Sequence, residues 1–110
     1  MRKNQEFQEV YHRGTSYANR YLVMYLLPNR GKKNCIGISV SKKVGNSVVR
    51  HRTKRLIRES FRLNEEKCKS GYQIVVVARV LSKGKDYKEI EGALLHLFKL
   101  HGILKETANS

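Results

Sequence analysis

The sequence predicts a single domain of the α/β (α+β) class with a mixed sheet, and three observations support this. The chain has 110 residues, a length that suits one domain (1–110) able to bury roughly two-thirds of its unfolded surface. Hydrophobic residues make up 40% of it and recur with the periods of helices and strands. Between residues 34 and 80, a strand pattern, a helical pattern and a second strand pattern follow one another, which predicts a helical crossover between parallel strands.

The N-terminal residues predict a short helix followed by a polar segment. Residues 4–12 have helical periodicity, Asn4 can cap the start of the helix and Gly14 can end it. The following residues 14–20 are small and polar, and they fit either a loop or a short edge strand. The apolar face of the helix contains Phe7, Val10 and Tyr11.

Two strand patterns come next and are joined by a turn. Residues 21–27, YLVMYLL, are apolar on both faces, whereas residues 34–41, NCIGISVS, alternate between large apolar and small side chains. The turn at residues 28–31 predicts that the two strands pair as an antiparallel hairpin. On the second strand, the face with Gly37 and Ser39 is bare of large side chains. Either a ligand or another backbone approaches it closely, or a helix packs on it.

Residues 42–59, KKVGNSVVRHRTKRLIRE, form the most distinctive segment of the chain. Seven Lys or Arg and no acid lie in residues 42–58, and they supply half of the formal net charge of +14. A polar turn interrupts the segment, and Asn46 or Ser47 can cap a helix that begins near Val48.

The predicted helix has one apolar face for the core and one cationic face. Like charges at i,i+4 spacing cost a few tenths of a kcal/mol per pair, and a face that served only solubility would mix both signs. We therefore expect a polyanion contact rather than a solvated face, with nucleic-acid phosphates as the best fit. The apolar face contains Val49, Thr53, Leu56, Ser60 and Leu63, with Ile57 and Phe61 beside it. The opposite arc contains His51, Lys54, Arg55, Arg58 and Arg62, with Arg50 and Arg52 on its flanks.

The C-terminal part predicts one strand and one helix. Residues 64–71 form a charged loop, and residues 73–80, QIVVVARV, form a near-continuous apolar strand of the kind that is buried on both faces. Asp86 caps a last helix that runs to about His101, and residues 106–110 are expected to fray. The apolar stripe of this helix contains Tyr87, Ile90, Leu94, Leu97, Phe98 and His101.

The excess of positive charge restricts the class of partner. Lys and Arg number 23 against 9 Asp and Glu, and the pI is near 10.1, so we expect polyanionic partners. No apolar run approaches the roughly 18 residues of a membrane span, and the N-terminus has no apolar signal region, so we expect a cytoplasmic location and no membrane partner. Cys35 and Cys68 are expected to be reduced, and no metal-ligand spacing joins them to the histidines.

No catalytic constellation is visible in the sequence. A nucleophile–base pair, paired carboxylates and a phosphate-binding loop are all missing from its patterns. Nine acidic residues in a chain of net charge +14 leave few ligands for Mg²⁺. We therefore expect no catalytic residues, no metal site and no cofactor bound by the protein alone.

Paired lysines, a glycine–asparagine turn and an arginine-rich helix form one continuous pattern in this chain. These positions are Lys42, Lys43, Gly45, Asn46, Arg50, Arg52, Lys54, Arg55 and Arg58. The pattern closely resembles that of the protein subunit of bacterial ribonuclease P, with His51 where the family usually has asparagine. The first helix, residues 14–20, the strand with Tyr25 and residues 38–43 also match in order, so the resemblance covers nearly the whole chain.

The resemblance implies both a fold and a function. The fold would have the element order α-β-β-β-α-β-α, with a left-handed crossover through the arginine-rich helix. The chain would be the protein subunit of a ribonucleoprotein endonuclease that removes the 5′ leader from precursor tRNA. The catalyst would be the RNA subunit with bound Mg²⁺, so the partners would be ribonuclease P RNA and precursor tRNA, with no protein partner required.

The resemblance also implies two sets of RNA-contacting residues. Arginine suits the first set because its planar fork binds phosphate bidentately and stacks on bases. The aromatic second set would line a cleft for the single-stranded leader, where stacking is worth about 1–3 kcal/mol per base. Ordinary core packing is the alternative for these aromatic residues. The first set comprises Lys42, Lys43, Asn46, Arg50, Arg52, Lys54, Arg55 and Arg58, with Arg20 and Arg62 as second-rank candidates. The second set comprises Phe7, Tyr11 and Tyr25.

Three other readings compete with this one. The main alternative is a general RNA-binding structural protein, such as a small ribosomal protein, which would have a similar composition. A self-contained nuclease would need metal-ligating residues that the sequence does not show. A DNA-binding module would need a two-helix reading unit or a dimer motif.

Overall fold

The computed structural model describes residues 4–29, 31 and 33–105, so the expected fraying of residues 106–110 lies outside the described residues. The elements follow the predicted order α-β-β-β-α-β-α, and residues 14–20 contain the edge strand β1. The bounds are α1 Asn4–Arg13, β1 Thr15–Ala18, β2 Leu22–Pro28, β3 Cys35–Ser39, α2 Ser47–Asn64, β4 Tyr72–Ala78 and α3 Tyr87–Leu100. Two short 3-10 turns, η1 Glu65–Lys67 and η2 Val80–Ser82, follow α2 and β4.

The four strands form one mixed sheet in the order β1-β2-β4-β3. Strand β3 runs parallel to β4, as predicted for the crossover through α2. The predicted hairpin between β2 and β3 is wrong, because β4 lies between them and pairs antiparallel with β2. The physical reason is burial: Ile74, Val75 and Val76 are fully buried, and a central strand is enclosed by helices on its faces and by neighbouring strands along its edges.

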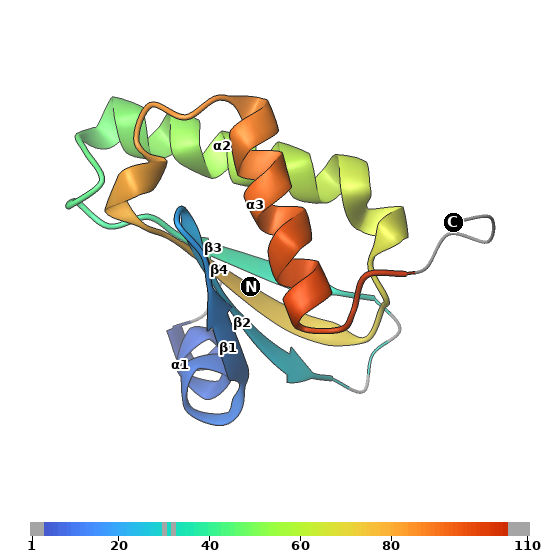
Figure 1. Ribbon diagram of the computed structural model, residues 1–110. Helices are drawn as coiled ribbons and strands as arrows, with labels where there is room; N and C mark the ends of the chain where they lie inside the picture. Colours follow the sequence, from blue (N-terminus) through green and yellow to red (C-terminus); the bar gives the residue numbers. More distant parts are fainter. Residues whose placement is uncertain (1–3, 30, 32, 106–110) are drawn as a thin grey trace.

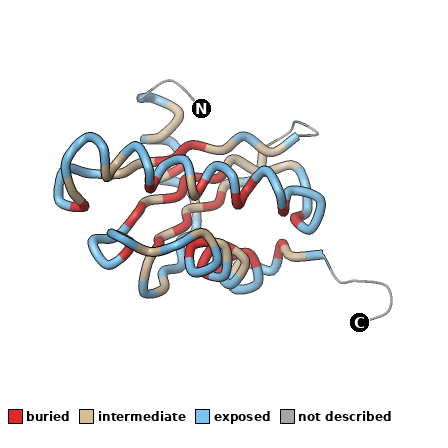
Figure 2. Tube along the Cα trace, turned by 90° about the horizontal axis from the view of Figure 1, so that it is seen from above, coloured by how far each residue is buried: buried red, intermediate tan, exposed pale blue. Residues whose placement is uncertain are grey.

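Helices cover the two faces of the sheet unequally (Figure 1). Helices α2 and α3 lie across one face and contact each other, whereas α1 lies on the opposite face. The main core forms under α2 and α3, and Figure 2 shows the buried residues along the strands and the inward sides of these helices. On β2, Leu22, Met24 and Leu26 are buried in this core, and the intervening side chains, including Tyr25, point to the α1 face. Strand β2 therefore has one buried face and one partly exposed face, although its residues are apolar on both.

Local interactions start α2 at the predicted turn. The Asn46 side-chain oxygen accepts a hydrogen bond from the Val49 backbone N–H at 3.0 Å, which confirms Asn46 as the cap. Gly45 is required there because a Cβ atom would lie 2.7 Å from a Val49 methyl carbon. The helix therefore begins at Ser47, and its residues keep the predicted helical spacing.

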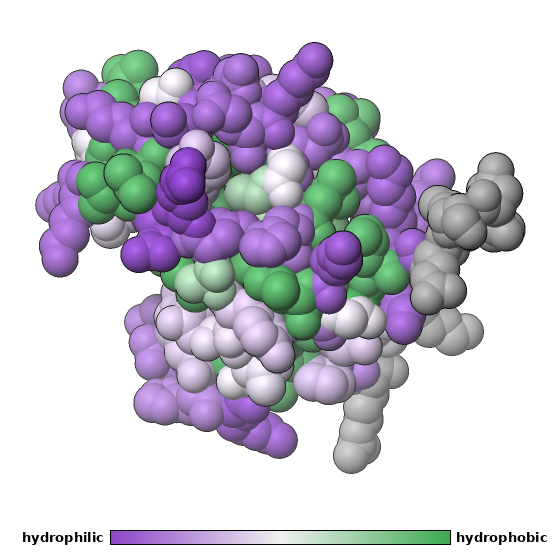
Figure 3. Space-filling view, in the orientation of Figure 1, coloured by the Kyte–Doolittle hydropathy of each residue, from purple (hydrophilic) through white to green (hydrophobic). Residues whose placement is uncertain are grey.

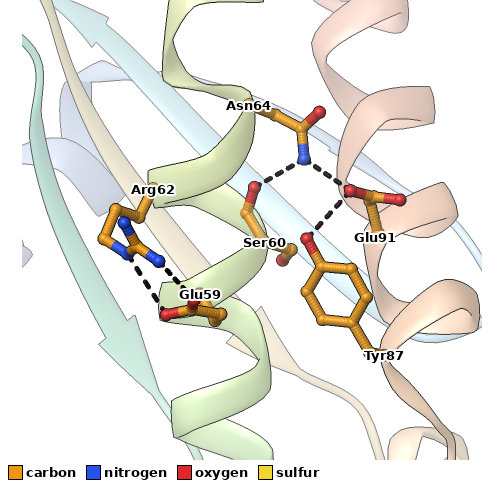
Figure 4. Close-up of polar contacts among 6 residues, drawn as sticks. All are labelled: Glu59, Ser60, Arg62, Asn64, Tyr87 and Glu91. Carbon is orange, nitrogen blue, oxygen red and sulfur yellow. Dashed lines mark hydrogen bonds and ion pairs between the residues drawn. The ribbon is translucent and has the colours of Figure 1, made fainter.

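Two boundary predictions are wrong. Leu63 was assigned to the apolar face of α2 but is 56% exposed, and the neighbouring Asn64 is buried in its place. The Asn64 amide donates hydrogen bonds to the Ser60 carbonyl and to the Glu91 carboxylate of α3, each at 2.8 Å (Figure 4). Helix α3 thus covers the side of α2 that carries Asn64. Val80, assigned to the last strand, lies in η2 and is 54% exposed, because β4 ends at Ala78.

Helix α3 begins with a capping box. The Asp86 carboxylate accepts from the Glu89 backbone N–H at 2.9 Å, and the Glu89 carboxylate accepts from the Asp86 N–H at 3.5 Å. We expect Asp86→Ala to lower the free energy of unfolding by about 1 kcal/mol, because a helix N–H loses its partner. Urea denaturation measures this change. Asp86→Asn, which preserves a capping oxygen, should stay close to the wild type, and equal losses in both variants would contradict the capping role.

The thiol of Cys68 lies in the core, and its ionisation makes the free energy of unfolding depend on pH. It is 2% exposed, and burial raises its pKa from 9.0 to about 11, partly offset by a hydrogen bond from Asn34. In the unfolded chain the thiol ionises at lower pH, so the stability that it contributes is complete below pH 9.0 and is lost as the pH rises to about 11. We expect the difference in unfolding free energy between the wild type and Cys68→Ala to shrink across this range. The exposed Cys35, replaced by alanine, is the control, and a difference independent of pH would contradict the prediction.

Candidate nucleic-acid interface

The first candidate surface is the cationic face of α2, which consists of Arg50, Arg52, Lys54, Arg55 and Arg58. All of these side chains are exposed except Arg50, which is half-buried, and the preceding Lys42 and Lys43 are exposed as well. In Figure 3, where α2 runs along the upper edge of the molecule, this edge is mostly hydrophilic. The structure therefore brings the predicted cations together on the side of α2 that faces away from the core.

One flank of this face has a hollow of about 410 Å³, here called the α2 hollow. Its lining consists of Arg52, Arg55, Leu56, Arg58 and Glu59. Arg52 also donates a long hydrogen bond of 3.4 Å to the Lys85 carbonyl in the loop before α3. Leu56 and Glu59 were not among the predicted site residues, although their helical spacing of four and seven from Arg52 places them on the same flank.

The other flank of α2 has a smaller hollow of about 220 Å³, lined by Val40, Ser47, Arg50, His51 and Lys54. Within the described residues, the Nε atom of Arg50 is buried and has no hydrogen-bond partner. A guanidinium with an unused N–H is suited to a phosphate oxygen, because charge-assisted hydrogen bonds to phosphate are short and strong. His51, which stands where the resembled family usually has asparagine, also lines this hollow.

The three predicted aromatic residues meet between α1 and the sheet, and we call them the aromatic cluster. The ring centroids of Tyr11 and Tyr25 lie 4.8 Å apart at 76°, and those of Phe7 and Tyr11 lie 6.4 Å apart. All three side chains are half-buried, so they are neither enclosed in the main core nor fully exposed. Burial raises the pKa of Tyr11, and its hydrogen bond with Ser39 acts in the opposite direction.

A hollow of about 250 Å³ opens beside the aromatic cluster. Phe7 and Tyr11 line it together with Ser39, from the strand face that the sequence predicts to be bare. Gly37 on the same face is buried, whereas Ser39 borders the hollow, so part of this face is covered and part is open. Asn4 and Ile38 complete the lining.

The two second-rank candidates for RNA contact differ in their surroundings. Arg62 is paired with a carboxylate, and Arg20 lies away from the cationic face and the aromatic cluster. Arg62 donates to both carboxylate oxygens of Glu59 (Figure 4), and this hydrogen bonding lowers the pKa of Glu59. Arg20 lines a different hollow of about 310 Å³, next to Tyr21 and the exposed His96 of α3. Arg62 therefore lies on the exposed side of α2 but is already paired, whereas Arg20 lies outside the cationic face.

Among residues 4–29, 31 and 33–105, no three His, Cys, Asp or Glu side chains are grouped so that they could hold a metal ion. Within the same ranges, no helix is long and apolar enough to cross a membrane.

A mixed sheet with a cationic helix on one face and half-buried aromatic rings on the other defines a small α/β RNA-binding protein. The family model for ribonuclease P matches residues 1–101. A ribonuclease P protein component from Lachnoclostridium phytofermentans is 58% identical over 107 residues, which cover 97% of this chain and 92% of the relative. One from Clostridium botulinum is 57% identical, with 94% of each chain covered.

Solved structures agree with these relatives in fold. The ribonuclease P protein of Staphylococcus aureus has a TM-score of 0.88 at 37% identity and covers 96% of both chains. That of Thermotoga maritima has a TM-score of 0.84 at 32% identity and covers 91% of this chain and 94% of its own. The chain belongs to the ribonuclease P protein family, whose members act in the 5′ processing of tRNA as the protein component of a ribonucleoprotein endoribonuclease. None of these relatives favours the alternative of a small ribosomal protein.

Proposed function

We propose that this protein binds ribonuclease P RNA through the cationic face of α2 and holds the 5′ leader of precursor tRNA beside the aromatic cluster. The observation that carries the proposal is the separation of the two surfaces. The cations project from α2 on one face of the sheet, whereas the aromatic rings lie under α1 on the other. One molecule can therefore contact two RNA segments at once.

The cationic face binds phosphates in this proposal. Lys42, Lys43 and Asn46 lie in the turn that leads into α2, so they extend the cationic face beyond the start of the helix. The side chains within α2 supply planar guanidinium groups and one ammonium group. Neutralising about five phosphates gives a slope of roughly −3.5 to −4.5 in a log–log plot of affinity against salt concentration.

The aromatic cluster holds unpaired bases of the leader in this proposal. Half-buried rings keep their positions because they pack against the sheet, yet they leave edges and faces for stacking. The adjoining hollow of about 250 Å³ gives space for a base beside Phe7 and Tyr11. The small side chain of Ser39 allows the strand to come close to the bound RNA.

Catalysis belongs to the RNA subunit and its Mg²⁺ in this proposal, and no protein side chain takes part in the chemistry. Several carboxylates are already engaged within the fold: Glu59 with Arg62, and Glu91 with Asn64 and Tyr87 (Figure 4). The net charge of +14 lowers the repulsion between the two RNAs, which lets Mg²⁺ act at lower concentration. The protein works in the cytoplasm and requires no protein partner.

Cleavage of a precursor tRNA by a bacterial ribonuclease P RNA at low, near-physiological Mg²⁺ tests the proposal. The reaction is run without protein, with this protein, and with the protein but no RNA subunit. We expect the protein to restore cleavage and to be inactive alone. Binding of RNA without any stimulation would instead indicate an RNA-binding domain with another partner, and cleavage by the protein alone would require an active site in the chain.

A further inference from the structure

The α2 hollow differs in chemistry from a simple phosphate site. A phosphate site would have cations and N–H groups only, but this hollow also has an apolar side chain and a carboxylate, those of Leu56 and Glu59. The Glu59 carboxylate repels a phosphate that enters the hollow, and its lowered pKa keeps it charged. The lining therefore favours a ligand that has apolar faces and a polar edge.

Three of the lining side chains are held in place by the fold. Arg52 donates to the Lys85 carbonyl, and Glu59 accepts two hydrogen bonds from Arg62. Leu56 is half-buried and packs against the main core. These three side chains thus have partners within the fold before any RNA binds, which reduces the cost of ordering them on binding.

The size and chemistry of the hollow match an unpaired nucleobase. A volume of about 410 Å³ admits a base with part of its ribose. Guanidinium planes such as that of Arg55 stack on base faces, and Leu56 gives an apolar surface beneath them. The Glu59 carboxylate still has lone pairs that can accept from an amino group on the base edge.

We propose that the α2 hollow holds one unpaired nucleobase of the bound RNA, stacked against Arg55 and Leu56 and hydrogen-bonded through an edge N–H to Glu59. This inference rests on the proposed RNA binding by α2 and adds a base-selective position to it. The remaining cations of α2 hold the phosphates on either side of that base. RNA with an unpaired nucleotide should therefore bind more tightly than fully paired RNA.

The test uses two RNA hairpins that differ by a single bulged adenosine, with binding to the full-length protein measured at several salt concentrations. We expect the bulged hairpin to bind about tenfold more tightly, which is the scale of one base–side-chain stack. Arg55→Lys keeps the charge but removes the planar guanidinium, and it should abolish most of this preference. Glu59→Gln removes a repulsive charge, so both hairpins should bind more tightly, and it replaces a charge-assisted hydrogen bond to the base by a weaker neutral one, so the preference should fall.

Lys54→Ala is the matched control, because Lys54 is exposed on α2 but lines the other hollow. It should weaken the binding of both hairpins by the same factor and leave their ratio unchanged. Equal affinity of the wild type for the two hairpins would overturn the inference while leaving RNA binding by α2 intact. A preference that survives Arg55→Lys and Glu59→Gln but is lost in Tyr11→Ala would place the base at the aromatic cluster and also overturn it. Failure of both hairpins to bind would contradict the proposed function as well.

Discussion

Simultaneous replacement of Arg52, Arg55 and Arg58 by alanine is expected to lower the affinity for ribonuclease P RNA about 100-fold. Each exposed guanidinium contributes about 1 kcal/mol, Arg52 and Arg58 through phosphate contacts and Arg55 through the stacked base, and three such losses give a factor of this size. The salt dependence should also become shallower by roughly one to two units in the log–log slope, because about two fewer counterions are released. Filter binding at a series of salt concentrations measures both quantities.

A second triple variant tests whether the affinity for RNA depends on the position of the removed charges or only on their number. Lys88, Lys99 and Lys105 are exposed and lie outside α2, and their replacement by alanine removes the same net charge. We expect this control to retain most of the affinity and most of the slope. If the two triple variants lost equal affinity, the overall charge of +14 rather than the cationic face of α2 would drive binding.

Replacement of Tyr11 by alanine is expected to lower the affinity of the assembled holoenzyme for precursor tRNA about tenfold or more, because a base of the leader loses its stacking partner. The affinity for mature tRNA, which has no leader, should not change. Tyr11 is the central ring of the aromatic cluster and lies 4.8 Å from Tyr25 and 6.4 Å from Phe7. Equilibrium binding of the two tRNAs to the same holoenzyme preparation gives the ratio directly.

Tyr17 is a matched control for this experiment. It is 47% exposed on the neighbouring strand β1, but its ring packs edge-on against His101 at the end of α3, on the other face of the sheet. Tyr17→Ala should leave the ratio of precursor to mature affinity unchanged. A similar loss in both tyrosine variants, or an equal loss for both tRNAs in Tyr11→Ala, would contradict a leader site at the aromatic cluster.

Local sequence was sufficient to predict the parts of this protein that short-range interactions determine. The caps at Asn46 and Asp86 each depend on a side chain within four positions of the first helical turn, and the cationic face of α2 depends on cations at three- and four-residue spacing. The continuous apolar run of β4 likewise indicated a strand buried on both faces. The element order and the candidate residues of α2 followed from these patterns and from the family resemblance.

The tertiary structure decided the pairing of the strands and the neighbours of each site residue. β4 pairs with both β2 and β3 because its apolar side chains are best buried at the centre of the sheet, under helices on both faces. The local turn between β2 and β3 contains no information about that distant strand. Packing of α3 on α2 exposes Leu63 and buries Asn64, a difference of one residue that helical periodicity does not resolve. The same long-range packing brings Tyr11 to Tyr25. The family resemblance indicated these residues, but their contact depends on the folded chain.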